Sequence, residues 1–305
     1  MSPAERPWRG EYGAGPTAWQ AVLDEAVAAN SPDRTPHRLA EILLSTDPVI
    51  TRPRGSRRTG LPTGKPDTVQ TRTAARLLMG WAERMSSRAE ADAWRVLALL
   101  SLTRYPQTAV DGGLEEILQR TADHKASVAA ARVADEPTLL ALALLHLAIS
   151  SRDSYDSALS LSVATEAQQV VAGMPPGDGR PCEVLAAALG GAGWLPSSKE
   201  TQGLLRIRAH ARAAIAARML RDYDRAVLER DLQIDAASAL IDSHPTLPLS
   251  ALGQRGGLAR ALGDITTALS IAERQAEYCA EHDSRAIRRQ YLVSRHSFAK
   301  YLDDW

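Results

Sequence analysis

Apolar residues recur along most of this chain with the spacing of α-helices. The first clear run consists of Trp19, Val22, Leu23, Ala26 and Val27. These positions follow i, i+3, i+4, i+7 and i+8, which places them on one face of a helix. Similar stripes recur toward the C-terminus, and no segment shows the strict alternation typical of a strand. The pattern predicts an all-α fold of about thirteen helices paired by short turns.

The most apolar of the predicted helices runs from about Asp135 and Pro137 to Ile149. Leu and Ala occupy nearly every side of it, which predicts a central helix buried on all faces. Its apolar run is too short to span a membrane and is interrupted by His146, so we expect no membrane segment.

Two helix–turn–helix units with matching turns occupy residues 209–283. Their turns read LRDYDRA over 220–226 and LGDITTA over 262–268, and a weaker copy reads RDSYDSA over 152–158. An Asp in each turn is expected to cap the second helix by accepting from its free N–H groups. We expect a Tyr or Ile just inside the second helix to pack against the first, and an Ala three residues later to allow close approach. These residues are Tyr223 and Ala226, Ile265 and Ala268, and Tyr155 and Ala158.

These hairpins resemble tetratricopeptide (TPR) repeats, most strongly over residues 203–283. The matching residues are Leu252, Gly256, Ala259, Ile265, Ala268 and Ala272 in the last unit, Ala214, Ala217, Tyr223 and Ala226 in the preceding one, and Leu142, Leu145, Tyr155 and Ala158 in the third. The resemblance implies a right-handed α-hairpin solenoid that binds a protein or peptide on its concave face.

The resemblance also implies which residues line the concave groove. They are Arg208, Ile215, Arg218, Met219 and Arg260. A guanidinium fork suits a carboxylate, so an acidic peptide or the C-terminus of a partner protein is the expected ligand. The alternative interpretation is that these arginines are solvated, or are paired with acids such as Asp222 and Glu229.

The chain divides into three predicted regions. Residues 1–15 are expected to form a flexible tail, and residues 16–134 an irregular N-terminal helical region. Residues 135–305 are expected to hold the TPR-like repeats and a C-terminal capping helix, whose apolar stripe is Ile287, Tyr291, Phe298, Tyr301 and Leu302.

A basic loop over residues 46–66 interrupts the N-terminal region. Residues 51–66 of the loop contain no acidic residue and five basic ones, which are Arg52, Arg54, Arg57, Arg58 and Lys65. The loop either contacts phosphate groups or an acidic partner, or is a solvated insertion. The first interpretation leads to an alternative function, a nucleic-acid-associated regulator that uses residues 52–65.

The overall composition limits these alternatives. The protein has 36 basic and 36 acidic residues and a formal net charge of zero, whereas nucleic-acid-binding domains usually carry a basic excess. Aromatic residues make up only 5%, so the core must consist largely of aliphatic side chains, which favours closely packed helices. Cys182 and Cys279 are far apart and indicate neither a zinc site nor a disulfide framework. We expect a cytoplasmic protein, since residues 1–7 lack the apolar core of a signal peptide.

No catalytic or cofactor motif appears in the sequence. The G-x-x-x-x-G-K-[ST], H-E-x-x-H and G-x-S-x-G patterns are all absent, and the seven histidines lack metal-ligand spacing. We therefore expect a non-enzymatic protein without a metal or cofactor. An enzyme on a helical scaffold, with a site that the sequence does not reveal, is the remaining alternative.

Overall fold

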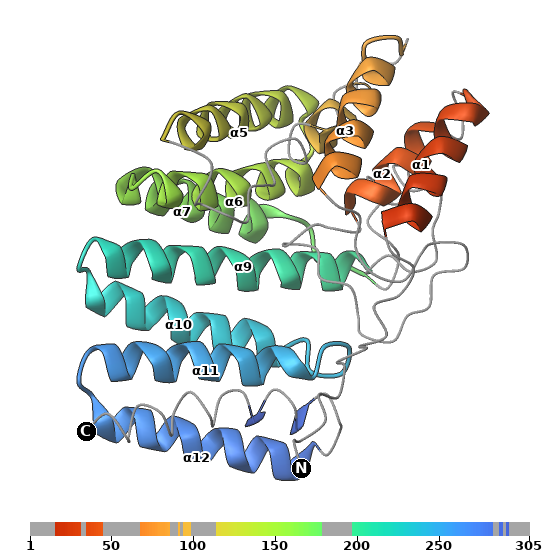
Figure 1. The fold of residues 1–305 in the computed structure, drawn as a ribbon. Helices are drawn as coiled ribbons and strands as arrows, with labels where there is room; N and C mark the ends of the chain where they lie inside the picture. The colour runs from red at the N-terminus through yellow and green to blue at the C-terminus, as the bar shows by residue number, and fades with distance from the viewer. Residues whose placement is uncertain are drawn as a thin grey trace, which may run out of the picture.

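The protein forms an all-α structure in which most helices lie side by side in a stack (Figure 1). The computed structural model describes residues 16–31, 35–44, 68–85, 91, 94–98, 114–178, 197–282, 287–288 and 291–292. The predicted tail, the basic loop and most of the predicted capping helix lie outside these residues. The described parts contain no β-strand, which confirms the predicted fold class. The helices are α1 (Pro16–Ala29), α2 (Thr35–Leu44), α3 (Thr68–Ala82), α5 (Leu114–Ala134), α6 (Pro137–Asp153), α7 (Ser157–Gly173), α9 (Ser198–Met219), α10 (Tyr223–Ser238), α11 (Thr246–Ala261) and α12 (Ile265–Glu281).

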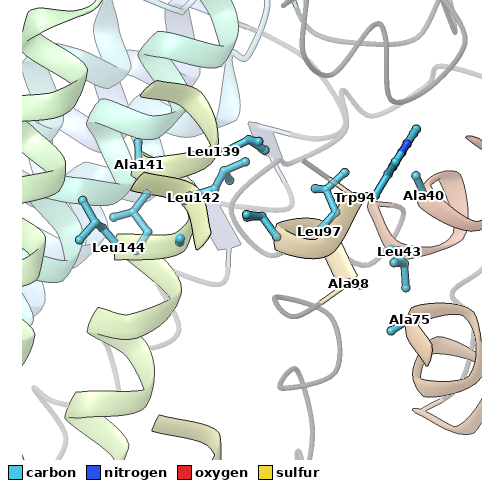
Figure 2. Packing of buried hydrophobic residues seen from close by; sticks show 14 of the residues in the cluster. Ala40, Leu43, Ala75, Trp94, Leu97, Ala98, Leu139, Ala141, Leu142 and Leu144 are labelled. Atoms are coloured by element: carbon cyan, nitrogen blue, oxygen red, sulfur yellow. The ribbon is translucent and has the colours of Figure 1, made fainter. Parts of the chain in front are cut away.

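The N-terminal helices share one hydrophobic core with the stack. Trp19 of α1 and Leu43 of α2 are fully buried, and so are Trp94 and Leu97 of a short helical segment. Figure 2 shows Leu97 and Trp94 between α6 on one side and Ala40 of α2 on the other. The cluster continues through α6 and α7 into α9.

Helix α6 lies at the centre of this core, as its sequence predicts. It packs against α5, α7 and α9, and residues on all its sides are buried. Its N-cap is Glu136 rather than Asp135, because the Glu136 carboxylate accepts from the N–H of Leu139 at 2.7 Å. Among the described helices, none has an apolar stretch of the length needed to cross a membrane.

Three hairpins, α6–α7, α9–α10 and α11–α12, share one turn geometry. The second helix of each begins after an N-cap Asp: Asp156, Asp222 or Asp264. The carboxylate of each accepts from the backbone N–H three residues later, which satisfies one of the free donors of the helix. Each Asp also donates its own N–H to the carbonyl five residues earlier, at 2.8 to 2.9 Å. The expected Asp caps are therefore confirmed, and the same turn occurs three times.

The residue before each cap has a left-handed backbone conformation, and this corrects the alignment of the first hairpin. Tyr155, Arg221 and Gly263 have φ values of 62°, 62° and 75°. Tyr155 therefore lies in the turn, 83% exposed, and does not pack on α6 as predicted. The predicted close-packing residue Ala158 is also exposed, and Ser160 takes the buried position. The alignment was wrong because it matched Tyr155 to Tyr223 instead of matching the cap residues. Tyr223, which was predicted to pack on α9, is itself 43% exposed.

Local hydrogen bonds and proline positions determine where the central helices begin and end. Ser197 and Glu200 form a capping box at the start of α9, with bonds of 3.2 and 2.8 Å. Helix α10 ends at Ser238, after which the N–H groups of Leu240 and Ile241 bond to carbonyls three residues back. Helix α11 begins at Thr246, and Pro248 falls in its first turn, where proline is tolerated.

Candidate functional site: an arginine-lined cavity on α9

One face of α9 lines a cavity of about 500 Å³. The lining residues of α9 are Arg208, Ala211, Arg212, Ile215, Arg218 and Met219. Their spacing of three or four residues keeps them on a single face of the helix. Arg152 from the last turn of α6, Arg230 from α10 and Gln254 from α11 complete the lining. We call this the α9 cavity.

Four of the five predicted groove residues lie together in the α9 cavity. They are Arg208, Ile215, Arg218 and Met219. The fifth, Arg260, is not among the lining residues; it lies in the last turn of α11. The predicted juxtaposition is therefore observed within α9 and does not extend to Arg260.

Arg260 is nevertheless equivalent to two cavity residues in the repeated hairpins. Arg152, Arg218 and Arg260 each stand four residues before a cap Asp. The carbonyl of each accepts from the N–H of the left-handed turn residue, at 3.0 Å in all three turns. The stack thus carries one arginine per hairpin at the same position, in a row that continues beyond the cavity.

Three of the lining arginines are not among the groove residues predicted from the sequence: Arg152, Arg212 and Arg230. Arg212 follows Arg208 by four residues, so the helical period already placed it on the predicted face. Arg152 matches Arg218 only when the first hairpin is aligned on its cap residue, Asp156. Arg230 could not be predicted from the sequence in this way. It belongs to the second helix of its hairpin, whereas the TPR resemblance assigns the groove residues to first helices.

The α9 cavity contains five guanidinium groups and no carboxylate among the lining residues that the structure describes. The carboxylate beside it, Asp153, is already engaged: Oδ2 accepts from Arg120 at 3.2 Å and Oδ1 from Arg152 at 2.5 Å. Within the described residues, Arg208, Arg212 and Arg218 make no ion pair, and the buried Nε of Arg208 has no hydrogen-bond partner. Most of the positive charge in the cavity is therefore uncompensated by the described part of the protein.

Arg230 is 9% exposed and is held by neutral side chains. Its Nη1 donates to Gln233 Oε1 at 2.6 Å and to Gln254 Oε1. These amides satisfy donors without neutralising the charge, so the Arg230 guanidinium is fixed in place and still positive.

The buried positions lower the pKa values of three arginines in the cavity. Burial, and then the neighbouring Arg152 and Arg208, lower the pKa of Arg212 to about 10. Burial, and then Arg218, lower the pKa of Arg230 to about 10, and burial lowers that of Arg208. All three remain protonated at neutral pH, so an anion entering the cavity meets fixed positive charge.

The acids proposed as partners of the groove arginines are occupied elsewhere. Asp222 caps α10. Glu229 is 5% exposed and faces α7 and α9, where its Oε2 accepts from Gln168 at 2.6 Å and lies 2.7 Å from His210 Nδ1. Arg225 lies 3.8 Å from its other oxygen. The described structure therefore does not support the alternative in which Asp222 or Glu229 pairs with the groove arginines.

Comparison with known proteins adds no assignment: the sequence matches no protein-family model and no curated protein. Within the described ranges, no group of three or more His, Cys, Asp or Glu side chains is placed to hold a metal ion. The predicted basic-loop residues Arg52, Arg54, Arg57, Arg58 and Lys65 lie outside the described residues. The α9 cavity is thus the candidate site, and its chemistry suits the binding of an anion.

Proposed function

We propose that this protein is a non-enzymatic, TPR-like adaptor or regulator that binds an acidic segment of a protein partner in the α9 cavity. The observation that carries the proposal is the convergence of five arginines on one cavity, with no carboxylate on its described lining: Arg152, Arg208, Arg212, Arg218 and Arg230. Guanidinium groups held in such positions form strong, charge-assisted hydrogen bonds to carboxylate or phosphate oxygens.

The repeated hairpins support a protein segment as the ligand. The arginine row of Arg152, Arg218 and Arg260 places one cation at the same position of each hairpin. An extended acidic segment that crosses the hairpins would meet these cations in turn. Ile215 and the exposed Met219 offer apolar contacts beside the charges, which is the mixture that a peptide side group requires.

The proposal is tested by fluorescence anisotropy with a labelled hexaglutamate peptide at fixed ionic strength. A cavity double variant, Arg208→Ala with Arg218→Ala, removes two lining cations. A surface double variant, Arg206→Ala with Arg221→Ala, removes two exposed arginines outside the lining and changes the net charge equally.

We expect the cavity double variant to weaken binding at least tenfold and the surface double variant less than twofold. Equal weakening by both would show that the peptide senses only the net charge. Absence of binding to the wild-type protein at low salt would overturn the acidic-segment proposal directly.

A further inference from the structure

The charge in the α9 cavity exceeds what a single carboxylate neutralises. Arg208, Arg212, Arg218 and Arg230 have no carboxylate partner within the described residues, while Asp153 already accepts from Arg120 and Arg152. The carboxylate of an Asp or Glu brings one negative charge. A phosphate monoester brings close to two at pH 7, together with three strong acceptor oxygens.

The directions from which the donors come also favour a phosphate. The guanidinium groups belong to α6, α9 and α10, so they approach one volume from three helices. A carboxylate accepts mainly in its own plane, whereas the oxygens of a phosphate point in tetrahedral directions and can each take a separate donor. Arg208 lines the cavity, and its buried Nε has no hydrogen-bond partner in the described structure.

The size and lining of the cavity leave room for more than an inorganic ion. Its volume is about 500 Å³, and Ala211, Ile215 and Met219 supply apolar surface beside the arginines. An organic group that carries the phosphate can therefore lie along these residues while the phosphate faces the guanidinium groups.

We infer that the α9 cavity binds a phosphate monoester dianion, carried by a phosphorylated residue of the partner. The inference rests on the proposed function and specifies the chemistry of the ligand. A free organic phosphate has the same charge and shape, and the experiment below separates the two sources.

The test is isothermal titration calorimetry with three probes on the full-length protein at pH 7.5 and fixed ionic strength. The first is a glycine pentapeptide with phosphoserine at its centre, the second is the same peptide with aspartate at that position, and the third is free phosphoserine. We expect the phosphopeptide to bind at least tenfold more tightly than the aspartate peptide. Tighter binding of the phosphopeptide than of free phosphoserine supports a protein source, whereas equal or weaker binding overturns that part of the inference.

Matched variants assign the binding to the cavity. Arg212→Ala is expected to weaken phosphopeptide binding at least tenfold, while Arg206→Ala, an exposed arginine on the same helix, changes it less than twofold. Arg212→Lys keeps the charge but loses the fork and should give an intermediate affinity. Equal loss in the Arg212→Ala and Arg206→Ala proteins, with both folded by circular dichroism, would overturn the assignment.

The pH dependence of the binding affinity reports on the ionisation of the ligand. Among the described lining residues of the cavity, the ionisable ones are all arginines, and these stay charged between pH 5 and pH 7. A phosphate with its second pKa near 6 loses about nine-tenths of its dianion over this range, so affinity should fall by up to tenfold. A flat profile would contradict dianion recognition.

The outcomes also separate this inference from the proposed function. If the aspartate peptide and hexaglutamate bind as tightly as the phosphopeptide, the phosphate inference is wrong and the acidic-segment proposal stands. If neither hexaglutamate nor the phosphopeptide binds, both are wrong.

Discussion

Replacing Arg212 by Met is expected to stabilise the ligand-free protein at neutral pH. The substitution removes a half-buried charge that faces Arg152, Arg208 and Arg230, and it keeps an unbranched apolar stem in the same space. If the cavity binds an anion, as proposed, this repulsion is present whenever no anion is bound. The change therefore tests whether the positive charge of the cavity is uncompensated.

The magnitude follows from the pKa of Arg212. A fall from the ordinary arginine value to about 10 corresponds to roughly 3 kcal/mol of penalty on the charged form, at about 1.4 kcal/mol per pKa unit. Partial access to water and lost packing reduce the gain, so we expect the free energy of unfolding to rise by about 1 to 3 kcal/mol.

The Arg212→Met substitution is expected to raise the free energy of unfolding over a wide range of pH. Because the pKa of Arg212 is lower in the folded protein, the unfolded state binds the proton more tightly, and the penalty is fully present below pH 10. The difference in stability between wild type and Arg212→Met should therefore be constant between pH 6 and pH 9.

Urea unfolding followed by circular dichroism measures the effect. Arg206→Met on the same helix is the control, and for an exposed residue outside the cavity it should change stability by less than about 0.5 kcal/mol. A loss of more than about 1 kcal/mol in Arg212→Met, with an unchanged urea slope, would refute the reasoning. It would mean that favourable contacts hold the guanidinium in the folded state.

Three further predictions concern the scaffold that holds the cavity. Gly263→Ala should lower the free energy of unfolding by about 1 kcal/mol in urea titrations, because φ is 75° there; no loss would contradict the turn geometry. Glu229→Leu leaves His210 and Gln168 without their acceptor, and should cost about 3 kcal/mol by the same assay. Burial lowers the pKa of His244 against the opposing effect of Glu200, so wild-type stability should fall as pH drops below about 6.5. A His244→Gln protein should lose that part of the pH dependence, and an unchanged profile would exclude His244 as its source.

The fold was predictable because local signals agree with it. The capping box at Ser197 and Glu200, the apolar α6 and the Asp caps each act within a few residues, and each appears in the structure. The predicted alignment of the first hairpin was wrong at Tyr155, because the register depends on the position of the cap Asp156 and not on the similarity of Tyr155 to Tyr223. The backbone hydrogen bonds of the turn, which the sequence does not display, decide that register.

The site was predictable only in part, for a related reason. Arg208 and Arg218 lie on one helix, and helical spacing alone brings them to one face. Arg152 and Arg230 reach the cavity from other helices, so their placement depends on how the hairpins pack. The engagement of Glu229 with His210 likewise depends on packing between helices, and only the structure excludes it as a partner of the cavity arginines.

The most direct test of the central claim is a comparison of the partners retained from native lysate by three proteins, identified by mass spectrometry. They are the wild type, the cavity double variant (Arg208→Ala with Arg218→Ala) and the surface double variant (Arg206→Ala with Arg221→Ala). If the α9 cavity binds the partner, the wild type and the surface double variant retain one stoichiometric partner at moderate salt, and the cavity double variant loses it. Equal retention of that partner by all three proteins would contradict the assignment of binding to the α9 cavity.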